Sequence, residues 1–173
     1  TYLLVGFWYA QPLVVTAARD AFLTKRVGDV LLLMSVVAVT AWSGVTSFED
    51  LYSWSAQKTL LPLAATLLGL GLIAGPTGKC AQVPMHLWLD EAMEGPNPAS
   101  ILRNSVVVTC GAIVLLKVMP LLQNAPVTLV VLQVIGSISA IGGSLVSIAQ
   151  VDIRRTLSYS TTAYLALGCS AMS

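Results

Sequence analysis

Long stretches without a charged residue constrain this sequence more than any other feature. They lie between Asp29 and Glu49, between Lys58 and Lys79, between Lys117 and Asp152, and from Thr156 to the end. Each is about as long as, or longer than, the roughly 20 apolar residues that cross the hydrocarbon core of a bilayer as one helix. Only 10% of the residues are charged, against roughly 25% in an ordinary soluble domain. The sequence therefore predicts a chain that crosses a membrane several times.

The overall charge gives no reason to expect a nucleic-acid partner. The formal net charge is +1, whereas a nucleic-acid surface needs clustered Lys and Arg side chains. The mean hydropathy of +0.82 makes lipid the first partner to expect.

The spacing of apolar residues predicts an all-α fold, a polytopic transmembrane helix bundle. The apolar runs lack the period-two alternation of strands, and helices satisfy their own backbone hydrogen bonds inside a membrane. The expected helices cover residues 1–9 as the end of a span, 27–43, 59–94 with a break, 98–119, 127–149 and 155–173. This gives five full crossings. Because the chain opens inside what reads as a helix, we expect a fragment of a longer protein.

The cysteines predict no metal site. Cys80, Cys110 and Cys169 lie far apart in the sequence and form no C-x-x-C pair. We interpret each as a small packing residue and expect neither a metal nor a redox centre in this chain.

The helix that begins near residue 59 is expected to break within residues 75–98. Pro76 and Pro84 lack an amide hydrogen and interrupt the helical hydrogen-bond ladder. A broken membrane helix exposes backbone groups, which are tolerated only where protein or a water-filled cavity receives them. A break that also carries Lys79 and His86 therefore predicts a hydrated interior site.

Lys79 and Arg103 are charges within expected spans, and two interpretations stay open for each. Lys79 either snorkels to the far interface or is a buried amine. Burial disfavours the charged form of an amine, so a buried lysine takes up and releases protons near neutral pH. Arg103 is either an interfacial anchor or a fixed positive charge, because a guanidinium keeps its proton.

His86 and a nearby carboxylate cluster are further candidates. Histidine exchanges protons near neutral pH, although a lone His beside Trp88 is also a common interfacial residue. Asp90, Glu91 and Glu94 fall on adjacent turns of a short helix. One carboxylate there takes up protons or pairs with a base, unless the cluster is a solvated loop.

Asp29 is expected near the start of the first full helix. A carboxylate in that place stabilises a helix through capping and the helix dipole. Because Val27 and Gly28 before it already look helical and apolar, a buried ion pair is the other interpretation.

Three groups of motifs stand in a fixed order along the chain. They are K-R-V-G-D at residues 25–29, the stretch from G-K at 78–79 through W-L-D at 88–90 to A-M-E-G-P at 92–96, and D-I-R-R at 152–155 followed by Y-S-T at 159–161. Together they resemble the antiporter-like subunit 5 of complex I, the NuoL/NdhF type, over nearly the whole chain. The resemblance implies that residues 1–173 belong to a transmembrane antiporter-like domain.

The resemblance implies a proton channel and no catalytic residue in this chain. The family has a lysine on a broken helix, matched here by Lys79, which pairs with a glutamate that would precede Thr1. Asp29 matches an acidic residue near that pair. His86 and Arg154, the latter in the matching D-I-R-R segment, are assigned to the same proton pathway.

The next relay residue of the family is a histidine, and this sequence departs from the pattern there. Asn104 stands in its place, with Arg103 beside it. Neither side chain titrates readily at neutral pH, so the ordinary relay is expected to be altered.

Residues 87–105, which contain this departure, closely resemble the NdhF variants of cyanobacterial photosynthetic complex I that are specialised for carbon dioxide uptake. The resemblance implies a proton-translocating subunit of a ferredoxin:plastoquinone oxidoreductase in the cyanobacterial thylakoid membrane. Proton movement would be coupled to hydration and uptake of carbon dioxide.

The same resemblance implies partners and cofactors outside this chain. The partners are other complex I membrane subunits, including an NdhD-type neighbour, and a peripheral Cup-type subunit that is similar to carbonic anhydrases. Plastoquinone and iron–sulfur clusters are expected in other subunits and none in this chain.

Two other functions stay open. An ordinary complex I subunit 5 or an Mrp-type sodium/proton antiporter subunit predicts a histidine where Asn104 stands. A passive membrane scaffold, which only docks a peripheral carbonic-anhydrase-like subunit, predicts that the Lys79 amine is dispensable.

Overall fold

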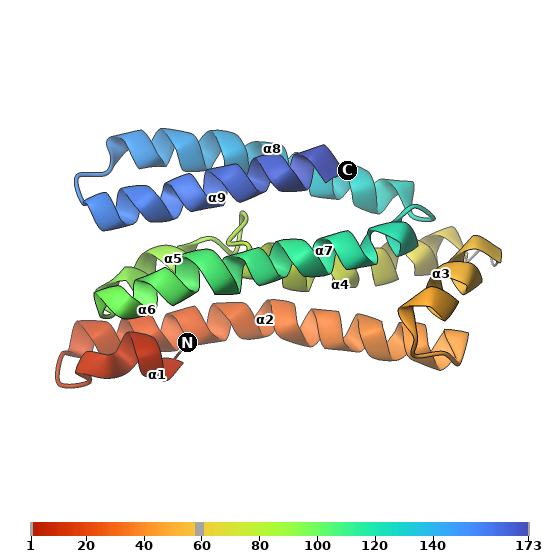
Figure 1. The fold of residues 1–173 in the computed structure, drawn as a ribbon, viewed down its shortest axis with the longest axis horizontal. Coiled ribbons are helices and arrows are strands. Elements are labelled where there is room, and N and C mark those ends of the chain that lie inside the picture. The colour runs from red at the N-terminus through yellow and green to blue at the C-terminus, as the bar shows by residue number, and fades with distance from the viewer. Residues whose placement is uncertain (1, 58–60, 173) are drawn as a thin grey trace.

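The computed structural model describes residues 2–57 and 61–172, apart from the side chain of Arg103. In that part of the chain every regular element is a helix, which confirms the expected all-α fold. Figure 1 shows the long helices lying along the longest axis of the molecule in three layers. One outer layer is α2 (Pro12–Ser43), the middle layer is α4 (Pro62–Lys79) with α7 (Val108–Leu122), and the other outer layer is α8 (Pro126–Ala149) with α9 (Ile153–Met172).

Short elements connect these helices. They are α1 (Tyr2–Val5), a 3-10 turn (Gly6–Trp8), α3 (Phe48–Gln57), α5 (Leu87–Glu91), a second 3-10 turn (Ala92–Glu94), α6 (Asn97–Ile101) and a π-helix (Leu102–Val107). Residues 97–122 therefore form one long helical element whose middle is a π-helix.

The helix expected at residues 27–43 is longer in the structure, because α2 begins at Pro12. Proline is favoured in the first turn of a helix, where its missing amide hydrogen costs nothing. The helix ends where Gly44 adopts a φ of 72° and its amide donates to the carbonyl of Thr40. Charged residues such as Arg19 and Lys25 continue a helix well, so the charge pattern located the start of the apolar surface rather than the start of the helix.

The other expected helices lie within a few residues of their expected ranges, although residues 1, 59, 60 and 173 fall outside the described part. The short helix α3 lies in none of the expected ranges. Within that part, two helices are long and apolar enough to cross a membrane, Asn97–Leu122 and Pro126–Ala149. A third span results if α2 and α3, which meet at a bend of 68°, are counted as one broken span. The five crossings inferred from the charge-free stretches stay a prediction.

The helix breaks within residues 75–98, as expected, but not at Pro76. Pro76 is inside α4, which continues to Lys79, so the expectation of a break at Pro76 is wrong. The irregular stretch runs from Cys80 to His86 and includes Pro84, which follows a cis peptide bond. The helix survives Pro76 because the next turn is still bonded, with the Cys80 amide donating to the Pro76 carbonyl at 2.8 Å.

Glycines bring α2 and α4 into close contact beside the break. A Cβ atom on Gly28 would lie 2.9 Å from the carbonyl oxygen of Ala74, and one on Gly75 would lie 2.7 Å from the Cβ of Leu32. Both distances are shorter than real side chains tolerate, so only glycine allows these backbones to approach so closely. This contact sets the distance between Asp29 on α2 and Lys79 at the end of α4.

Candidate functional site: an ion pair at a broken helix

Lys79 and Asp29 form a short ion pair, with 2.6 Å between Lys79 Nζ and Asp29 Oδ1. Lys79 is the last residue of α4, where a positive charge is favoured by the helix dipole. Asp29 lies well inside α2, so the interpretation of Asp29 as a helix cap is wrong. The two side chains are only 29% and 30% exposed, which places a charge-assisted hydrogen bond at the edge of the protein interior.

Asp29 has a second positive partner. Arg26, one turn earlier on α2, lies with its guanidinium 3.7 Å from Asp29 Oδ2. Asp29 therefore contacts two positively charged side chains, Arg26 on its own helix and Lys79 at the end of α4.

An open cleft of about 490 Å³ gives the pair access to the protein surface. Its walls come from α1, from Phe22 and neighbouring residues of α2, and from Val107 of the π-helix. The glutamate that the family places near the lysine would precede Thr1 and so lies outside the described residues.

Trp88 connects the far side of the break to the same site. Its side chain is fully buried, and its Nε1–H donates to the carbonyl of Gly78 at 2.8 Å. The Lys25 amine lies 3.4 Å from the centre of the Trp88 ring, within cation–π range. From the sequence, Trp88 is an interfacial aromatic residue, and this anchoring role is not apparent. A tryptophan next to a proline-containing break was the available signal.

The carboxylate cluster is paired with α9. Arg155 contacts Asp90 Oδ2 at 3.5 Å and Glu94 Oε1 at 3.3 Å, and its Nε lies 3.9 Å from Asp152. Glu91 has no ion-pair partner within 4.0 Å among the described residues. The cluster therefore pairs with a basic residue and is not a free solvated loop. That residue is Arg155, which in the sequence is only a charge at the edge of an expected span.

Arg154, the neighbour of Arg155, is exposed. Its guanidinium lies 3.5 Å from the backbone carbonyl of Met93. It therefore contacts the same connecting segment as Arg155, through the backbone rather than through a carboxylate.

His86 and Asn104 each have a buried polar atom, His86 Nδ1 and Asn104 Oδ1, that finds no hydrogen-bond partner in the described part of the chain. Asn104 lies in the π-helix Leu102–Val107, a wide helical turn that is often found at functional sites. No hydrogen bond between described residues joins either side chain to Lys79. The side chain of Arg103 lies outside the described part.

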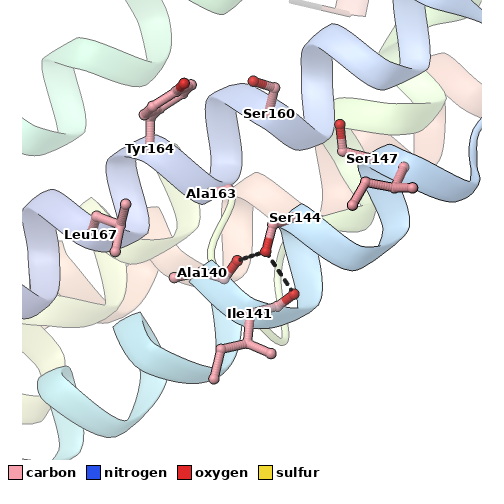
Figure 2. Close-up of a pocket in the computed structure, with 9 residues that line it drawn as sticks. Ala140, Ile141, Ser144, Ser147, Ser160, Ala163, Tyr164 and Leu167 are labelled. Carbon is pink, nitrogen blue, oxygen red and sulfur yellow. Dashed lines mark hydrogen bonds between the residues drawn. The ribbon is translucent and has the colours of Figure 1, made fainter.

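A separate pocket of about 480 Å³ lies between α8 and α9 on the opposite side of the bundle (Figure 2). The Ser144 hydroxyl donates to the carbonyls of Ala140 and Ile141 on its own helix, so its hydrogen is not directed into the pocket. The other walls include Ile141 and Leu167. The pocket is lined mainly by apolar side chains, and the hydroxyl groups of Ser160 and Tyr164 also lie on its wall. In the described chain, no three His, Cys, Asp or Glu side chains are grouped to hold a metal ion.

Sequence comparison gives a match over the full chain. Residues 1–173 match the family described as NADH:quinone oxidoreductase/Mrp antiporter, TM. NAD(P)H-quinone oxidoreductase subunit 5, organellar chromatophore 2, of Paulinella chromatophora is 79% identical over 167 residues, which cover 96% of this chain and 27% of that protein. The chloroplast NAD(P)H-quinone oxidoreductase subunit 5 of Lolium perenne is 36% identical over 170 residues, 95% of this chain and 23% of that protein. The chain thus spans about a quarter of the length of these relatives.

Two solved structures share the fold. A chain of the Mrp complex from Dietzia sp. DQ12-45-1b superposes with a TM-score of 0.88 at 24% identity, over 99% of this chain and 19% of that chain. A chain of respiratory complex I from Thermus thermophilus gives a TM-score of 0.82 at 22% identity, over 97% of this chain and 36% of that chain. The overall fold of this chain is therefore found in both structures.

Proposed function

Because the chain belongs to the NADH:quinone oxidoreductase/Mrp antiporter membrane family, we propose that it is part of a proton-translocating membrane subunit of a quinone-reducing oxidoreductase. The observation that carries this proposal is the 2.6 Å ion pair of Lys79 and Asp29 at the end of a broken helix. The sequence relatives are named as subunit 5 of NAD(P)H-quinone oxidoreductases, which supports this assignment over other members of the family.

The geometry supports a proton carrier for a simple reason. The Lys79 amine lies on an open cleft, which gives protons a route to it from the protein surface. Asp29 holds the amine at 2.6 Å, and Arg26 is a second positive partner of Asp29. We therefore assign Lys79 as the group that carries the proton and Asp29 as the residue that positions it.

Replacing Asp29 with asparagine tests this role. We expect Asp29→Asn to slow proton translocation about ten-fold, because the charge-assisted hydrogen bond to the Lys79 amine is replaced by a weaker neutral one. The measurement is acidification of sealed membrane vesicles that contain the full-length protein in its complex. Asp20→Asn is the matched control, since Asp20 is also on α2 but pairs with the exposed Arg19. Equal rates for the two variants would contradict the role of Asp29.

The proposal extends to the carbon dioxide uptake form of photosynthetic complex I. Asn104 and Arg103 stand where an ordinary subunit 5 or an Mrp-type subunit is expected to carry a titratable histidine, which favours the uptake form over these alternatives. Hydration of carbon dioxide forms bicarbonate and releases one proton, and the reaction continues only if that proton is removed. A fixed positive charge at Arg103 would direct the proton along the path served by Lys79.

In this form the protein would lie in a photosynthetic membrane, as the chromatophore and chloroplast relatives support. We assign it to the cyanobacterial thylakoid. Its neighbours would be other complex I membrane subunits, an NdhD-type subunit among them, with a peripheral Cup-type carbonic-anhydrase-like subunit bound outside the membrane. Plastoquinone and iron–sulfur clusters would be held by other subunits.

Replacing Arg103 with histidine tests the uptake assignment. We expect Arg103→His to lower carbon dioxide uptake about five-fold or more, the size of a typical coupling between sites, because a titratable group replaces a permanent charge. Uptake of inorganic carbon and proton flux are measured together in intact cells. Arg103→Lys, which keeps a positive charge, is the control and should retain uptake. Unchanged uptake and proton flux in Arg103→His would contradict the assignment.

A further inference from the structure

Gln82 is a buried polar residue at the centre of the break that the proposed path does not yet use. Its side chain is only 1% exposed. The side-chain amide donates from Nε2 to the carbonyl of Cys80 at 3.0 Å and to the carbonyl of Thr162, on α9, at 3.4 Å. These contacts connect the irregular stretch to α9.

The two carbonyl acceptors fix which way the amide of Gln82 points. Both require a donor, so the nitrogen must face them and the oxygen must face away. Oε1 is buried and receives no hydrogen bond from any described residue. Buried acceptors in proteins are almost always paired with protein or with ordered water.

The neighbouring hydroxyl groups do not supply the missing donor. Ser139 donates to the carbonyl of Ile135 at 2.7 Å, and Thr162 donates to the carbonyl of Ser158 at 3.2 Å. Each hydroxyl has one hydrogen, which is therefore committed to its own helix. Both oxygens keep acceptor capacity, so they are able to accept hydrogen bonds from a water molecule.

The position of Gln82 places this unpaired oxygen between two layers of the bundle. Lys79 and Asp29 lie on the α2 side of the break. On the other side the amide of Val83 donates to Ser139 of α8 at 2.9 Å. Figure 1 shows the loop between α4 and α5 projecting toward the α8 and α9 layer. Gln82 therefore lies between the ion-pair side of the break and the α8 and α9 layer.

We propose that Gln82 Oε1 holds a buried water molecule and that this water passes protons between the Lys79 end of the break and the interface with α8 and α9. The second half of the proposal rests on the proposed proton-translocating function. The water donates one hydrogen to Gln82 Oε1. A proton that arrives on its oxygen is matched by another that leaves to the next acceptor, so water is regenerated at each step. Gln82 itself is a positioning residue and exchanges no proton.

The direct test is a high-resolution cryo-electron-microscopy map of the full complex that contains this protein. We expect a solvent oxygen within hydrogen-bond distance of Gln82 Oε1 in the wild type and its loss in Gln82→Met. A protein donor on Oε1, or an apolar void beside it, would overturn the proposal. The wild-type map gives this answer even if the variant fails to assemble.

Proton translocation by the same complex in sealed vesicles provides the functional test. We expect Gln82→Met to lower the rate about ten-fold, the ratio that corresponds to one lost hydrogen bond. Gln82→Glu should retain most of the rate, because a protonated carboxyl group keeps an acceptor oxygen and one of the two donated hydrogen bonds. Gln123→Met, at an exposed glutamine after α7, is the control.

The outcomes separate this inference from the function on which it rests. If Lys79→Ala abolishes translocation and Gln82→Met leaves it unchanged, the relay role of the Gln82 water is wrong and the proposed function stands. If Gln82→Glu is as slow as Gln82→Met, the acceptor is not what matters, and the inference is also wrong. If Lys79→Ala itself keeps the full rate, the proposed function fails.

Discussion

Replacing Lys79 with alanine is expected to lower proton translocation about 100-fold or more, the usual effect of removing a group that transfers protons. The variant should still fold. Alanine keeps the Cβ atom that packs beside Gly111 of α7, and Asp29 keeps Arg26 as a positive partner. The measurement is acidification of sealed vesicles that contain the full-length protein in its complex, with the amount of assembled complex determined in the same sample.

Lys117→Ala provides the control for Lys79→Ala. Lys117 is also a lysine on a long helix. The Tyr52 hydroxyl donates a hydrogen bond to its backbone carbonyl, and this contact does not depend on the Lys117 side chain. We expect this variant to translocate protons at the wild-type rate. A passive scaffold predicts equal rates for both variants, so wild-type activity in Lys79→Ala would favour the scaffold over the proton path.

Replacing Trp88 with alanine is expected to destabilise the protein by about 3–5 kcal/mol, because a large, fully buried side chain leaves a cavity. The change also removes the hydrogen bond to the Gly78 carbonyl and the ring beneath the Lys25 amine. The measurement is thermal denaturation of the purified complex, followed by its dissociation.

Two further variants serve as comparisons for the stability change in Trp88→Ala. Trp88→Phe keeps most of the packing and loses the indole hydrogen bond, which should cost about 0.5–1.5 kcal/mol. Trp42→Ala removes a tryptophan that is 53% exposed on α2 and should have little effect on stability. A Trp88→Ala variant as stable as Trp42→Ala would show that the break does not depend on this anchor.

The fold class follows from the sequence because the spacing of apolar residues and the length of the charge-free stretches both match helices that cross a membrane. The ends of the helices follow less well. α2 begins at Pro12 because Arg19, Lys25 and Arg26 are good helix formers. Their charges show where the helix meets water and not where it ends. Pro76 is accommodated inside α4 because the following turn is held by its own hydrogen bonds.

The candidate site, too, is predictable from the sequence only in part. Lys79 and Asp29 are recognisable from the sequence, as charges inside apolar runs, but their 2.6 Å contact depends on the glycines that bring α2 and α4 together. Arg155 and Gln82 were missed as site residues. Their partners are far away in sequence, 61 and 65 residues for Arg155 and 80 for Gln82 to Thr162, and only the packing of α9 brings them together.

The glycine contact between α2 and α4 also has a consequence for motion. The backbone of α2 at Gly28 lies directly against the backbone of α4 at Ala74 and Gly75, so we expect the two helices to move as one rigid body. We then expect shape changes during turnover to be concentrated in the irregular stretch between Cys80 and His86, which is bonded to α8 and α9 through Val83 and Gln82. In that case α2 and α4 would stay fixed, and the stretch between Cys80 and His86 would move relative to them as a hinge.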